Sequence, residues 1–184
     1  MPALARPTAA LAGLAAFGSL AAPCAAQTVA DFYRGRTINL YIGFPSGGGY
    51  DIYGRLAARH LGKYIPGNPS TVAQNMIGAG GLKAANFLYS GAPKDGTALG
   101  VIPDTSIAEE LLGTQGVAYV SKEFNWIGRI SPLINMVMIW NTVPVKTHAD
   151  TLKTEVTLAG TGAGSTVSIY PTVMNNLFGT KYKL

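Results

Sequence analysis

Three successive glycines followed by an acidic residue make residues 46–51 the part of this chain best suited to hold an anion. The segment reads Ser-Gly-Gly-Gly-Tyr-Asp and directly follows the apolar run of residues 38–45. Glycine lets the backbone turn sharply and bring its N–H groups close to a ligand. If a strand leads in and a helix leads out, free N–H groups and the helix dipole both favour negative charge there.

Three more loops of small or polar residues occupy the same place in a repeated pattern. Each follows a predicted strand (residues 70–76, 99–102 and 156–159) and precedes a predicted helix. We call residues 46–50, 78–81, 103–106 and 160–165 the first, second, third and fourth loops. The repeat predicts an α/β fold with parallel-rich sheets flanked by helices. Ligands bind beyond the carboxyl ends of such strands, so we expect the loops to converge.

The first predicted helix, over residues 50–64, carries an apolar stripe that includes Ile52, Leu56 and His60. Apolar residues at helical spacing are typical of a face that packs on the core. His60 is therefore predicted to be a packed, hydrogen-bonded residue and not a ligand. The basic row of Arg55, Arg59 and Lys63 lies off the stripe and is interpreted as a solvated face.

The loops lack the motifs of nucleotide binding and catalysis. The fourth loop ends in Ser165 where a Rossmann fingerprint has Gly or Ala, and no acidic residue follows it to hold a ribose. No G-x-S-x-G segment occurs, and neither histidine has a second type of metal ligand at useful spacing. Asp51 and Asp104 qualify by position for acid–base chemistry, but we favour helix capping for Asp51. The sequence predicts no enzyme, no cofactor and no metal.

Residues 1–26 have the composition of a secretory signal peptide, with cleavage expected after Ala26. A membrane anchor is the alternative, and a lipoprotein at Cys24 is disfavoured by the preceding Pro23. Cys24 is the only cysteine, so the mature chain would have none, which suits a bacterial periplasm. Net charge is +5; without Arg6 the chain has 13 basic against 9 acidic residues, or +4. The basic residues are scattered, so nucleic acid is not indicated as a partner.

Three blocks in fixed order resemble the periplasmic solute-binding receptors of tripartite tricarboxylate transporters, the Bug-type family. Residues 44–51 match a family block F-P-x-G-G-G-x-D, and residues 74–81 end in a block N-x-x-G-A-G-G. Residues 92–97 match A-x-P-x-D-G with one residue fewer. Residues 159–166 look like the family's loop that opens the second lobe. The resemblance covers about residues 32–184.

The resemblance implies a two-lobed Venus-flytrap fold that binds a small carboxylate through loop N–H groups and hydroxyls. Residues 27–130 would form the N-terminal part of the first lobe, and residues 131–184 the crossover and an incomplete second lobe. The family's chains are longer, so we expect this chain to be truncated at its C-terminus. Ser46 and Tyr50 depart from the commoner family residues. The predicted ligand-binding residues are Phe44, Ser46, Gly47, Gly48, Tyr50, Asp51, Gly78, Ala79, Gly80, Asp104, Thr105, Gly162, Gly164, Ser165 and Thr166.

The predicted function is an extracytoplasmic receptor that captures a small organic anion and delivers it to a membrane permease. The protein is expected to be a periplasmic monomer. One alternative is a receptor that presents its ligand to the histidine kinase of a two-component system. The other is an enzyme that uses the glycine loops for phosphate or a nucleotide.

Overall fold

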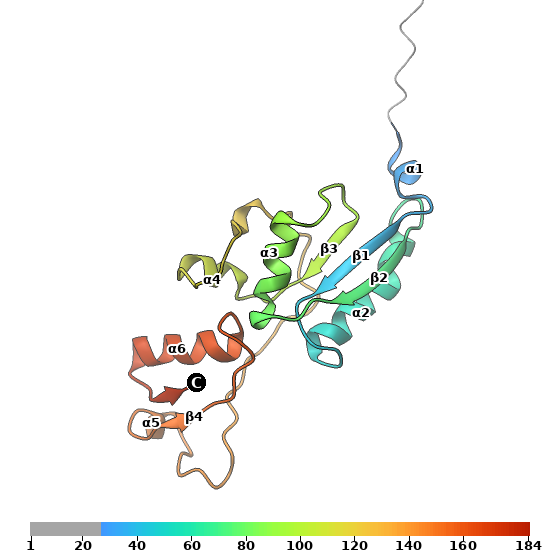
Figure 1. The fold of residues 1–184 in the computed structure, drawn as a ribbon. Helices are drawn as coiled ribbons and strands as arrows, with labels where there is room; N and C mark the ends of the chain where they lie inside the picture. The colour runs from blue at the N-terminus through green and yellow to red at the C-terminus, as the bar shows by residue number, and fades with distance from the viewer. Residues whose placement is uncertain (1–26) are drawn as a thin grey trace, which may run out of the picture.

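The computed structural model describes residues 27–184, so the predicted signal peptide lies outside the described residues. The chain forms a three-stranded parallel sheet followed by a smaller two-stranded parallel sheet (Figure 1). The elements, in chain order, are α1 (Val29–Tyr33), β1 (Thr37–Ile42), α2 (Gly49–Leu61), β2 (Ser70–Asn75), α3 (Leu82–Ser90), β3 (Ala98–Val101), α4 (Ser106–Leu111), α5 (His148–Thr151), β4 (Val156–Thr157), α6 (Thr166–Phe178) and β5 (Tyr182–Lys183).

The first sheet has the order β2-β1-β3, with every pair parallel. The central strand β1 supplies the core of this sheet, because its side chains Ile38, Leu40 and Ile42 are almost fully buried. A parallel sheet needs crossover helices on its faces, and α2 and α3 supply them. The predicted α/β fold with a parallel sheet is confirmed, and the predicted strands lie within a few residues of the observed ones.

Helices α2 and α3 cover opposite faces of this sheet. Ile42 reaches toward Gly54 of α2, whereas the ring of Tyr41 lies 4.9 Å from that of Phe87 in α3. Neighbouring residues of a strand point to opposite faces, so the two contacts place the helices on either side. Figure 1 shows the same arrangement, with α2 behind β1 and β2 and α3 beside β3.

The prediction that the apolar stripe of α2 packs on the core is wrong. Ile52, Leu56 and His60 are exposed, and the buried residues of the helix are Asp51, Gly54 and Ala58. The small side chains at Gly54 and Ala58 let the helix approach the sheet closely. The same rotation of the helix turns the carboxylate of Asp51 inward, toward the end of β2.

The second sheet pairs β4 with β5, with Val156 opposite Tyr182 and α6 as the crossover. A small core of Val145, Val156 and Tyr182 lies beneath it. Helix α6 is the helix predicted after the fourth loop and contains Pro171, whereas strand β5 was not predicted. Residues 125–140 contain no helix or strand, and Trp140 there is 77% exposed. Within residues 27–184, no helix has the length and apolar character needed to cross a membrane.

Gly62→Ala is expected to destabilise the protein, because its new methyl group would collide with the carbonyl oxygen of Pro69 at the entry to β2. Backbone atoms on both sides resist displacement, so the free energy of unfolding should fall by about 1–3 kcal/mol in urea titrations. Gly49→Ala, in the first turn of α2, is the matched control because its methyl group meets nothing within 4 Å. Equal losses in the two variants would contradict this account of the α2–β2 junction.

Candidate functional site

The first three loops leave the sheet at one edge. Ile42, at the end of β1, pairs with Asn75 of β2 and with Val101 of β3, so the three strands end side by side. In parallel sheets this carboxyl edge is where ligands bind. The predicted convergence of the first, second and third loops is therefore observed.

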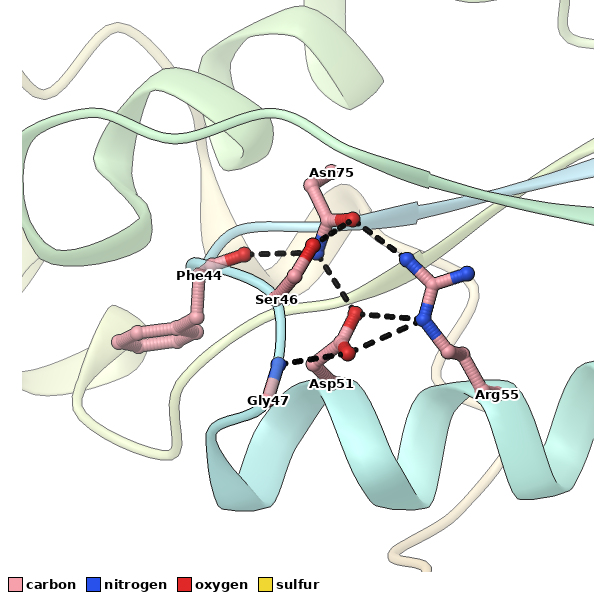
Figure 2. Close-up of polar contacts among 6 residues, drawn as sticks. All are labelled: Phe44, Ser46, Gly47, Asp51, Arg55 and Asn75. Carbon is pink, nitrogen blue, oxygen red and sulfur yellow. Dashed lines mark hydrogen bonds and ion pairs between the residues drawn. The ribbon is translucent and has the colours of Figure 1, made fainter.

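The carboxylate of Asp51 organises the first loop (Figure 2). Its Oδ2 accepts the Gly47 N–H at 2.9 Å, and the Arg55 Nε–H lies 3.0 Å from both carboxylate oxygens. The Asn75 amide donates to Oδ1 at 2.7 Å. Asp51 is only 3% exposed. Hydrogen bonds from Arg55, and then from the Gly47 N–H and Asn75, lower the pKa of Asp51 to about 2.

Asn75 ties the end of β2 to the same loop. Its amide donates to the Phe44 carbonyl at 2.9 Å, and its Oδ1 accepts from the Ser46 hydroxyl at 3.0 Å and from Arg55 at 2.7 Å. Sequence reasoning missed the contribution of Asn75 and Arg55. The signals were present, since Asn75 belongs to the second family-like block and Arg55 stands four residues after Asp51 on one helix.

Two long helices begin at glycine-rich loops with their first N–H groups uncapped by side chains. Helix α2 starts after Gly48, and α6 starts after Ser165. Ser165 occupies the N-cap position of α6, but its hydroxyl donates to the Gly162 carbonyl at 2.7 Å and caps no helix N–H. Each of these 13-residue helices therefore presents free N–H groups and the positive end of its dipole.

The second and fourth loops touch backbone to backbone. A methyl group at Gly80 would lie 2.5 Å from the Ser165 nitrogen, and one at Gly162 would lie 2.8 Å from the Gly80 nitrogen. The Thr105 hydroxyl, from the third loop, donates to the Gly164 carbonyl at 2.9 Å. The structure thus brings together Gly80, Thr105, Gly162 and Ser165 from the predicted set, with Ala79 and Gly164 at the same contact.

An aromatic pair lies beside the first loop. The rings of Phe44 and Tyr50 are stacked, with centroids 4.1 Å apart and planes 8° from parallel. The Tyr50 hydroxyl is buried and makes no hydrogen bond with residues 27–184. Burial, and secondly the negative charge of Asp104, raise the pKa of Tyr50 to about 12. The same two causes raise the pKa of Tyr170, so Asp104 stands near both phenols, and α6 contributes a residue that the sequence did not indicate.

Two cavities of the described region lie away from these loops. A pocket of about 510 Å³ is lined by residues that include Trp140, Lys146, His148, Met174 and Tyr182, none of them predicted as ligand-binding. Among residues 27–184, no group of three His, Cys, Asp or Glu side chains is arranged to hold a metal ion.

In comparisons with known proteins, neither a protein-family model nor a curated protein matches this chain.

Asp51→Asn is expected to lower the free energy of unfolding at neutral pH, because the amide cannot accept from Arg55, Gly47 and Asn75 as the carboxylate does. The folded pKa of about 2 lies below the ordinary value of 3.8, so this stabilisation is present above pH 3.8 and is lost as the pH falls toward 2. In urea titrations, the free energies of unfolding of the wild type and Asp51→Asn should converge over that range. Free energies of unfolding that stay equally far apart from pH 7 down to pH 2 would contradict this role of the carboxylate.

Gly164→Ala is expected to separate the second and fourth loops, because its methyl group would collide with Glu109 Oε1 and lie 3.0 Å from the Ala79 carbonyl oxygen. We expect a loss of about 1–3 kcal/mol in the free energy of unfolding. Gly160→Ala, in the same loop, meets only the Ser168 hydroxyl at 3.1 Å and is the control. If Gly164→Ala were as stable as Gly160→Ala, the loop contact would not be tight.

Proposed function

We propose that this chain is the ligand-capturing portion of an extracytoplasmic solute-binding receptor for a small organic anion. The observation that carries the proposal is the pair of uncapped helix starts, α2 and α6, at two glycine-rich loops. Free N–H groups and helix dipoles stabilise carboxylates without requiring a basic side chain. The four loops contain no lysine or arginine, which fits recognition by the backbone.

The ligand would lie between the start of α2 and the first turns of α6. Tyr50 and Tyr170 both lie near Asp104, so these two elements come together there, and the unpaired hydroxyl of Tyr50 supports this location. A buried hydroxyl without a partner loses hydrogen-bonding free energy, and a ligand oxygen would restore it. The ordered first loop supports binding in preference to catalysis, because both oxygens of Asp51 are already engaged.

The resemblance to receptors of tripartite tricarboxylate transporters supports the finer proposal. The first sheet would belong to one lobe and the second sheet to another, and the ligand would draw the lobes together by bridging their loops. The protein would act as a periplasmic monomer, with Gly47, Gly48, Gly78 and Thr166 near the anion, and would pass its ligand to a membrane permease.

Isothermal titration of the full chain with di- and tricarboxylates is expected to show binding of at least one acid, and the corresponding neutral amides are the controls. Tyr50→Phe keeps the ring that stacks on Phe44 and removes the unpaired hydroxyl. A hydrogen bond to a charged group contributes about 1.5–3 kcal/mol, so we expect affinity to fall about tenfold or more.

Tyr64→Phe is the matched control, because Tyr64 is 77% exposed and lies outside the loops. Its affinity should equal that of the wild type. Absence of heat for every acid, from a chain that unfolds cooperatively, would overturn the proposed function. Equal affinities for Tyr50→Phe and the wild type would remove Tyr50 from the site.

A further inference from the structure

Glu109 of α4 is a fully buried carboxyl group beneath the contact between the second and fourth loops. It is 0% exposed, and its Oε1 has no hydrogen-bond partner among residues 27–184. A methyl group at Gly164 would collide with that oxygen, so the fourth loop lies directly against it. Its Oε2 lies 2.8 Å from the Tyr119 hydroxyl. No sequence motif pointed to either residue.

The contacts of the Tyr119 hydroxyl fit a protonated Glu109. The Tyr119 oxygen lies 2.8 Å from the Ser106 carbonyl oxygen and 2.8 Å from Glu109 Oε2. The phenol has one hydrogen, and a carbonyl oxygen can only accept. If that hydrogen goes to Ser106, the short contact with Oε2 needs a second hydrogen, which only a protonated Glu109 supplies.

We propose that Glu109 is held as the neutral acid, donating to Tyr119, and that loss of its proton separates the fourth loop from the second. An ionised Glu109 would place a negative charge on Oε1, which has no partner and faces Gly164. The fourth loop lies directly against that oxygen, so its movement would admit water. Because a buried, unpaired charge is costly, loop separation is the response that relieves it.

Among residues 27–184, no basic side chain forms an ion pair with Glu109. The third loop contributes the Thr105 hydroxyl, which donates to the Gly164 carbonyl, and the exposed carboxylate of Asp104, whereas the second and fourth loops contribute no titratable group. The segment after α4 contributes Tyr119. Glu110, the next residue of the helix, accepts the Ser121 N–H at 2.7 Å. Burial is the main cause that raises the pKa of Tyr119, followed by the contact with Glu109, and the charge of Glu110 adds a smaller contribution.

The direction of the pH dependence follows from the burial of Glu109. Burial raises its pKa above the ordinary value of 4.5, and a hydrogen bond from Tyr119 would act in the opposite direction. The folded chain then binds the proton more tightly than the unfolded chain. The stabilising contribution is complete below pH 4.5 and is lost as the pH rises through the raised value.

One consequence of this inference concerns ligand binding, and it rests on the proposed function. If the fourth loop carries half of an anion site, a rise in pH would weaken binding by separating the loops. A fall in pH would restore it. Glu109 would then be a positioning residue, because it acts on the ligand only through Gly164 and its neighbours.

Hydrogen exchange measured by mass spectrometry tests the loop movement in the full chain without any ligand. Peptides covering residues 76–83 and 158–168 are compared in the wild type and Glu109→Gln from about pH 5 to about pH 8. The labelling times are scaled so that the intrinsic chemical exchange of the amides is the same at every pH. The neutral amide of the variant has no proton to lose. Between pH 4.5 and the raised pKa, exchange in the wild type should increase relative to the variant by up to about tenfold per pH unit and then level off, and the two should be closest at the acid end.

Glu110→Gln is the matched control, and it should keep the wild-type pH dependence. Identical profiles for the wild type and Glu109→Gln would overturn the proposal. If Glu109→Gln does not fold, infrared spectroscopy of the wild type and Glu110→Gln tests whether Glu109 is protonated. The carbonyl band of a neutral carboxylic acid, persisting above the ordinary glutamate pKa, supports the proposal, and its absence overturns it. A chain that shows the loop response but binds no carboxylate keeps this inference and loses the proposed function.

Discussion

The second and fourth glycine loops meet with nothing but backbone between them, and the arrangement of the loop cluster depends on that contact. Gly80 and Gly162 leave no room for a side chain where their main chains touch. The third loop reinforces the contact through Thr105, and the carboxyl group of Glu109 forms its floor. The start of α6 is thereby fixed close to the edge of the first sheet, although the two are separated by a long irregular segment of chain.

A second constraint, the Asp51 carboxylate, sets the orientation of α2. Asp51, Gly54 and Ala58 lie on one face, and that face is buried although its apolar content is small. Turning Ile52 and Leu56 inward would turn Asp51 away from Asn75 and Gly47. The helix therefore exposes its larger apolar side chains, and the first loop keeps the shape that the carboxylate imposes.

The sequence allowed the parallel sheet and its loops to be predicted, because strand and helix periodicities are local and each loop has distinctive glycines. It did not allow the packing face of α2 to be predicted, since the apolar stripe and the Asp51 network compete and only the folded chain shows which prevails. Asn75, Tyr119 and Tyr170 escaped notice for a related reason. Each acts through a partner distant in sequence, and no spacing rule connects Tyr119 to Glu109 or Tyr170 to Asp104. Strand β5 was missed because two residues carry too little periodicity.

Under the proposed function, the glycine contact also limits how sequence change could alter the choice of ligand. Any side chain added at Gly80 or Gly162 would have to part the two main chains before it could reach a ligand. The stacked ring of Tyr50 and the partly exposed ring of Tyr170 stand under no such restriction. Changes in ligand specificity would therefore arise from substitutions at the aromatic positions, whereas the glycines would stay unchanged.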